Sequence, residues 1–132
     1  MPDRATERAV VLTSQAIATP VNSSKILIAD YTEALVFLQV SAVSGTSPTL
    51  NPVVQVSDDD GTTWYTISKT WIQDDGDTIT QLTDGTNLAT NGLGSYVAQV
   101  SNIGKHMRVR FPAPGGSSTP TFTLVATIEA KN

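Results

Sequence analysis

The amino-acid sequence predicts an all-β protein, a single antiparallel β-sandwich of about eight or nine short strands. Three observations support this prediction. Short runs rich in Val, Ile, Thr and aromatic residues alternate with breaks rich in Gly, Pro, Asn, Asp and Ser along the whole chain. No stretch carries the 3.6-residue apolar period of an amphipathic helix. The length of 132 residues suits one domain that folds around its own hydrophobic core.

The N-terminal residues 1–8 are polar and precede the first apolar run. We expect them to form a flexible arm, which either orders on a neighbouring subunit or is simply a disordered terminus. The single sandwich domain is then predicted to cover residues 9–132. Its first two strands are expected at 9–13 and 25–29, which are short and rich in Val, Ile and Leu.

The next run, 33–43, is apolar on both of its alternating faces. One set is Val36, Leu38, Val40 and Ala42, and the other is Leu35 and Phe37. This pattern indicates a strand that is buried on both sides, in the middle of a sheet.

A turn is predicted at Gly45-Thr46-Ser47-Pro48, and a further strand at 51–57. Val54 and Val56 are expected to face inward in that strand. Pro52 falls among its first residues, where a missing N–H is tolerated.

The segment Ser57-Asp58-Asp59-Asp60-Gly61-Thr62-Thr63-Trp64 predicts a tight turn between strands 51–57 and 63–70. Aspartate side chains accept hydrogen bonds from the amides of a turn, glycine supplies a positive φ, and tryptophan anchors the hairpin by burial. The positions that carry this chemistry are Ser57, Asp59, Gly61, Thr63 and Trp64. They resemble the Asp-box of sialidases, and the resemblance implies a hairpin and no glycosidase activity.

The remaining strands are predicted at 78–82, 95–100, 106–111 and 119–130, with 83–94 as a long exposed loop. The last two strands alternate strictly between apolar and polar residues, and the Gly/Pro/Ser-rich segment 112–118 separates them. We therefore expect them to form a β-hairpin. The sequence leaves both a jelly-roll and an immunoglobulin-like strand order open.

Composition excludes several classes of function. The chain has no cysteine, so disulfides, thiolate metal sites and cysteine nucleophiles are ruled out. A net charge of −4 argues against a nucleic-acid partner, and the only local basic cluster is Lys105, Arg108 and Arg110. No apolar run reaches the ~18 residues needed to cross a membrane. The first residues lack the apolar centre of a secretory signal, so we expect no membrane association and no export.

No constellation of residues predicts catalysis, a metal or a cofactor. His106 is the single histidine, and alternation places it on a solvated face with Arg108 and Arg110. The acidic groups at 58–60 and at Asp74, Asp75 and Asp77 do not follow the spacing of an EF-hand loop, so they are interpreted as solvated turn residues. We therefore expect the protein not to be an enzyme.

Three aromatic residues, Trp64, Tyr65 and Trp71, lie close together in the sequence. Exposed aromatic rings can stack on sugars, whereas buried ones belong to the core. Strand alternation places Trp64 on the opposite face from the other two, and we expect the tryptophans to be buried.

The chain as a whole resembles a group of small all-β bacteriophage virion proteins. The resemblance follows the order of four segments: Gly-Thr-x-Pro-Thr-Leu-x-Pro at 45–52, the stretch 54–64, Gly-Lys-x-x-Arg-Val-Arg at 104–110, and a closing strand after a Gly/Ser-rich turn at 115–128. Such proteins are capsid decoration proteins, head fibres or tail accessory proteins.

The resemblance implies a non-enzymatic structural protein of the virion, most simply a capsid decoration (cement) protein. It would be made in the host cytoplasm and bound to the major capsid protein, or another virion protein, on the outer surface of the head. Threefold sites on an icosahedral shell favour a homo-oligomer that is a trimer. The basic residues expected to contact a partner are Arg4, Arg8, Lys105, Arg108 and Arg110. The alternative is a carbohydrate- or receptor-binding module of a tail fibre or a secreted enzyme.

Overall fold

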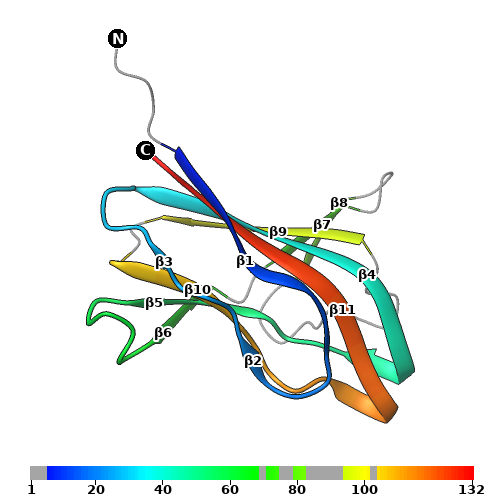
Figure 1. Ribbon diagram of the computed structural model, residues 1–132. Helices are drawn as coiled ribbons and strands as arrows, with labels where there is room; N and C mark the ends of the chain where they lie inside the picture. The colour runs from blue at the N-terminus through cyan, green and yellow to red at the C-terminus, as the bar shows by residue number, and fades with distance from the viewer. Residues whose placement is uncertain (1–5, 69–70, 75–78, 83–93, 102–103) are drawn as a thin grey trace.

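The computed structural model describes residues 6–68, 71–74, 79–82, 94–101 and 104–132, and within these ranges the protein contains strands and no helix (Figure 1). The predicted all-β fold is confirmed. The strands are β1 (Thr6–Ile17), β2 (Val21–Asn22), β3 (Ile26–Leu27), β4 (Glu33–Thr49), β5 (Val53–Ser57), β6 (Tyr65–Ser68), β7 (Trp71–Asp74), β8 (Ile79–Leu82), β9 (Gly94–Ser101), β10 (His106–Phe111) and β11 (Gly115–Lys131).

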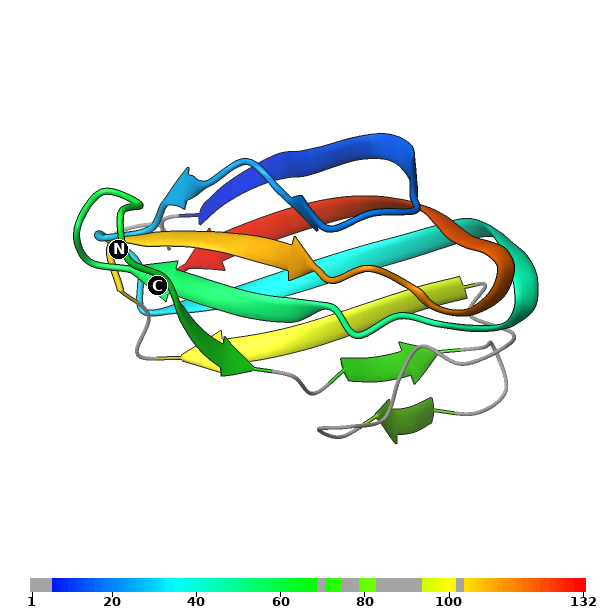
Figure 2. The ribbon, with the colours of Figure 1, turned by 90° about the horizontal axis from the view of Figure 1, so that it is seen from below.

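These strands form two antiparallel sheets that pack face to face (Figure 2). Sheet A has the order β1-β11-β4-β9-β7-β8. Sheet B has the order β2-β10-β5-β6, and β3 also pairs with β10. The predicted β-sandwich is therefore confirmed. Eleven strands are described where about nine were expected from the spacing of the turns, because β2 and β7 were not predicted as separate strands.

The core lies between the two sheets and consists of every second residue of their long strands. Sheet A contributes inward rows from β4, β9 and β11, and sheet B contributes the inward row of β10. The largest fully buried side chains are Trp71, Tyr96, Phe111, Phe122, Ile17, Ile28, Leu38, Leu50, Met107, Leu124 and Ile128. Alternation with period two therefore identifies the buried face of β10, of the apolar part of β11 and of β4 as far as Val40.

Strand β4 is central, as predicted, because it pairs with β11 on one side and with β9 on the other. Its inward residues Val36, Leu38 and Val40 are buried. The prediction is wrong for Ala42, which is exposed because the register with β11 shifts between Val40 and Ala42. Leu35 and Phe37 on the opposite face are only half-buried, since no layer of the described chain covers the outside of sheet A.

The predicted hairpin between 106–111 and 119–130 is wrong. Strand β10 lies in sheet B and pairs with β2, β3 and β5, whereas β11 lies in sheet A and pairs with β1 and β4. The segment 112–114 is therefore a crossing from one sheet to the other, and residues 115–118, expected in the loop, already belong to β11. Alternation alone could not show this, because strands in different sheets of a sandwich carry the same period.

The turn predicted at 45–48 is also wrong, because β4 continues to Thr49 and stays paired with β11. The pairing is irregular here, with register shifts beside Ser117, and Gly45 and Gly116 have φ of 100° and 115°. These glycines bend the two strands together at the end of the sandwich, before the chain crosses to sheet B.

The boundary of the N-terminal arm also differs from the prediction. Strand β1 begins at Thr6 rather than at residue 9, with Thr6 opposite Lys131 and Arg8 opposite Glu129. Residues 1–5, which include Arg4, lie outside the described residues, as does most of the loop predicted at 83–94.

Candidate functional site

The turn motif and the described residues that were expected to contact a partner lie on two opposite outer sides of the sandwich, and Arg4 lies outside the described residues. The turn at 57–64 and the cations Lys105, Arg108 and Arg110 belong to sheet B and its connections. Arg8 lies on the outer face of sheet A, as its pairing opposite Glu129 shows. The structure therefore does not bring the predicted partner contacts into one patch.

The turn between β5 and β6 is held by Ser57 and Asp59. The buried Ser57 hydroxyl donates to Asp59 Oδ1 at 2.7 Å and accepts from the amide of Gly61 at 3.0 Å. Asp59 Oδ1 also accepts from the amides of Thr62 and Thr63 at 3.1 and 2.7 Å. These hydrogen bonds lower the pKa of Asp59 to about 2, and those from Thr63 have the largest effect. The polar side chains of this motif therefore stabilise the turn.

Asp60 joins this turn to two other segments. It has a left-handed φ of 62°, followed by Gly61 at 92°. The Asp60 carbonyl accepts from Lys25 Nζ at 2.7 Å, and its carboxylate lies 2.8 Å from Lys105 Nζ. The hydrogen bond from Lys105 lowers the pKa of Asp60. Lys105, expected to contact a partner, is thus paired within the chain.

Trp64 was expected to be buried in the core, and this prediction is wrong. Its half-buried ring lies over sheet B, where the indole Nε1 donates to the Gly61 carbonyl at 2.9 Å and the Arg108 guanidinium stacks 4.1 Å from the ring centroid. Trp71 is 2% exposed and Tyr65 is 61% exposed. The three neighbouring aromatic residues therefore do not share one surface on which a sugar could stack.

The two arginines of β10 also bond to neighbouring strands. Arg108 Nε donates to Gln55 Oε1 at 2.9 Å, and Arg110 donates to Asn22 Oδ1 at 2.9 Å. Partial burial lowers the pKa of Arg108. On the outer face of sheet B, each of these two arginines thus donates a hydrogen bond to a neighbouring strand.

His106 is not solvated, so this prediction is wrong. Its side chain is 12% exposed because the 57–64 turn covers it, and Nδ1 lies 4.0 Å from Asp60 Oδ1. No hydrogen bond reaches Nδ1 from the part of the chain that the structure describes. Within those same ranges, no three His, Asp or Glu side chains gather where they could hold a metal ion, and no helix long enough to cross a membrane occurs.

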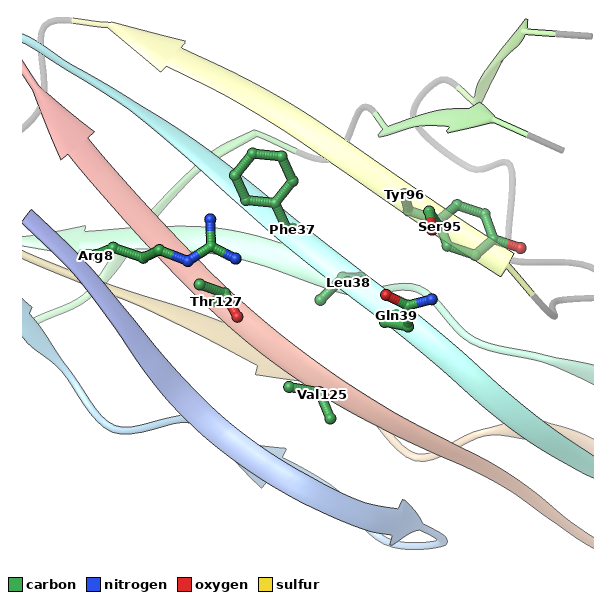
Figure 3. A pocket seen from close by; sticks show the side chains of 8 residues that line it. All are labelled: Arg8, Phe37, Leu38, Gln39, Ser95, Tyr96, Val125 and Thr127. Carbon is green, nitrogen blue, oxygen red and sulfur yellow. The ribbon is translucent and has the colours of Figure 1, made fainter. Parts of the chain in front are cut away.

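A groove on the outer face of sheet A was not predicted (Figure 3). It encloses about 390 Å³ and crosses β1, β11, β4 and β9. The Arg8 guanidinium lies 5.6 Å from the Phe37 ring centroid and 3.3 Å from Glu129, which places an ion pair over an aromatic ring at one end. The signal in the sequence was the second apolar set of β4, Leu35 and Phe37.

Comparisons with known proteins identify the fold. No family model and no curated protein matches the chain. Among solved structures, the crystal structure of the SPBc2 prophage-derived protein YomS is similar over 100% of this chain and 97% of that chain, with a TM-score of 0.54 and 8% sequence identity. At this identity the likeness establishes a shared fold.

Proposed function

We propose that this chain is a non-enzymatic structural protein of a bacteriophage virion. It decorates the outer surface of the head as a homo-oligomer bound to the major capsid protein. The main support for this proposal is that the fold is similar, over the full length of the chain, to that of a prophage-derived protein. The order of the four sequence segments that resemble phage virion proteins supports it independently.

The structure suits such a role physically. Strands β4 and β11 each extend over 17 residues, and the start of β1 pairs with the end of β11 at Thr6 and Lys131. Such extensive pairing leaves little flexible backbone for proteases in the paired segments. The absence of cysteine also removes thiol oxidation as a route to damage outside the cell.

The same geometry supports a role without chemistry. The buried Ser57 hydroxyl is bonded to Asp59 and to turn amides, so it serves the fold and not a nucleophilic role. His106 faces Asp60 beneath the turn, which leaves the imidazole largely closed to a substrate.

The test is binding to capsids prepared from a phage that lacks this gene. Purified protein is mixed with these capsids, and the pellet after sedimentation is measured over a range of concentrations. We expect saturable co-sedimentation and higher resistance of the decorated particles to heat. Retention on a polysaccharide column without capsid binding would instead support the carbohydrate-binding alternative.

A further inference from the structure

Apart from Glu33, Glu129 and Lys131 at one end, the outer face of sheet A carries no charged residue along the described parts of its three central strands. Its outward positions run from Leu35 to Gln39 on β4, from Ser95 to Gln99 on β9 and from Thr121 to Thr127 on β11, and all of them carry Leu, Phe, Val, Ser, Thr or Gln. The solvent-exposed face of a sheet normally carries charged residues. The outer face of sheet B follows this rule, since it carries Arg108 and Arg110.

Apolar side chains and a hollow add to this pattern. The groove at Phe37 and Val125 lies in the middle of the face (Figure 3). Val10 on β1 and Ile72 on β7 flank it, with exposed fractions of 56% and 39%, and both point outward because they pair opposite Thr127 and Val97. Depletion of charge together with aromatic and aliphatic groups distinguishes the core of a protein interface from ordinary surface.

We propose that this face packs against the same face of a second copy of the chain. The inference rests on the homo-oligomer of the proposed function and names its contact surface. Charges at one end of the face identify the occupant. The Arg8–Glu129 and Lys131–Glu33 pairs lie 3.3 and 4.0 Å apart, so both signs are present side by side. Such an arrangement is complementary to itself across a two-fold axis.

The strand order defines the geometry of the pair. A two-fold axis that runs along and between β4 and β11 lays β11 of each copy over β4 of the other. Since Lys131 is opposite Glu33 and Thr127 is opposite Phe37 in the register, Lys131 of one copy then faces Glu33 of the other. Two sheets pack in this way about 10 Å apart. The pair is a dimer and thus differs from the trimer expected from capsid symmetry.

The chain contains no cysteine, so a single introduced cysteine reports the contact cleanly. Val125→Cys lies beside the proposed axis, and Thr66→Cys lies on the exposed outer face of sheet B as the matched control. With a short bifunctional maleimide, we expect Val125→Cys to give a covalent dimer and Thr66→Cys to remain a monomer on a denaturing gel.

A charge substitution tests the same face without a cross-link. Gln39 is exposed, so Gln39→Lys makes the side chain only one atom longer and adds a like charge to both halves of the interface. We expect the dissociation constant from sedimentation equilibrium to rise by at least about 100-fold, whereas Thr66→Lys leaves it unchanged. Unaltered circular dichroism and melting of both variants would show that the fold is intact.

Two results would overturn the inference: a wild-type monomer at the highest soluble concentration, or an oligomer whose mass Gln39→Lys does not change. If Gln39→Lys abolished capsid binding without altering the mass in solution, the face would dock on the shell and the proposed copy contact would be wrong. Failure of the proposed function is a separate result, namely a dimer of this geometry that does not bind capsids.

Discussion

The stacked pair of Trp64 and Arg108 tests whether a cation on the outer face of sheet B contributes to the free energy of unfolding. The guanidinium lies 4.1 Å from the ring centroid, and the same side chain donates to Gln55 Oε1 at 2.9 Å. Cation–π contacts contribute about 0.5–1 kcal/mol at exposed sites and about 2 kcal/mol when desolvated. Trp64 is half-buried, so we expect about 1 kcal/mol from the stack.

Single substitutions remove more than the stack. Trp64→Ala also loses the hydrogen bond from Nε1 to the Gly61 carbonyl, for a total of about 2–3 kcal/mol. Arg108→Ala loses the bond to Gln55 as well, for a total of about 2 kcal/mol. Because both variants lose the same stack, the double variant should be more stable than the sum of the two predicts by about 1 kcal/mol.

The assay is urea denaturation followed by far-UV circular dichroism on the four proteins of the cycle. Arg110→Ala, combined with Trp64→Ala, is the control, because Arg110 bonds to Asn22 and should be additive with the tryptophan. A coupling free energy below about 0.3 kcal/mol would show that the Trp64 ring and the Arg108 guanidinium do not stabilise each other. Unchanged stability in Arg108→Ala alone would show that the arginine is free for a partner after all.

Three further substitutions test the turn and the bend at the end of the sandwich. Gly61→Val should lower the free energy of unfolding by at least about 1–2 kcal/mol, since the native φ is 92°, and equal melting of variant and parent would contradict the turn geometry. Gly116→Ala should cost at least as much, because its Cβ would come within 2.9 Å of the carbonyls of Thr46 and Ser47 at a φ of 115°; a variant as stable as wild type in urea would argue against that close approach. The pKa of Asp59 is lowered from 3.8 to about 2, so the stability that this carboxylate contributes is present above pH 4 and is lost as the pH falls toward 2. Denaturation midpoints between pH 2 and 7 should therefore approach those of Asp59→Asn at the acid end, and a constant difference would contradict the lowered pKa.

Local patterns in the sequence were reliable where a feature depends on neighbouring residues. The turn at 57–64 follows from the hydrogen-bonding capacity of Ser57 and Asp59 and from the freedom of Gly61, all within eight residues. The central position of β4 was also predicted from its two apolar sets, although the outer set, Leu35 and Phe37, is only half-buried. In the turn, the chemistry that decides the structure lies inside the segment itself.

Features that depend on distant parts of the chain could not be predicted in the same way. Residues 106–111 and 119–130 look like partners, but their real partners are β5 and β4, which lie far away in the sequence. The apparent exposure of His106 and Arg108 was wrong for the same reason. The 57–64 turn folds back over β10, where Trp64 covers Arg108 and Asp60 meets His106. Such contacts join strands that are distant in the sequence, and the apolar periodicity of a strand does not show which other strand it pairs with.

The most direct test of the central claim is cryo-electron microscopy of purified phage particles with and without this gene. We expect extra density at regular positions on the outer surface of the wild-type head. That density should be missing from the deletion particles and should be restored when the purified protein is added. Density in the tail instead of on the head, or mass spectrometry that finds no copies of the chain in the particles, would contradict it.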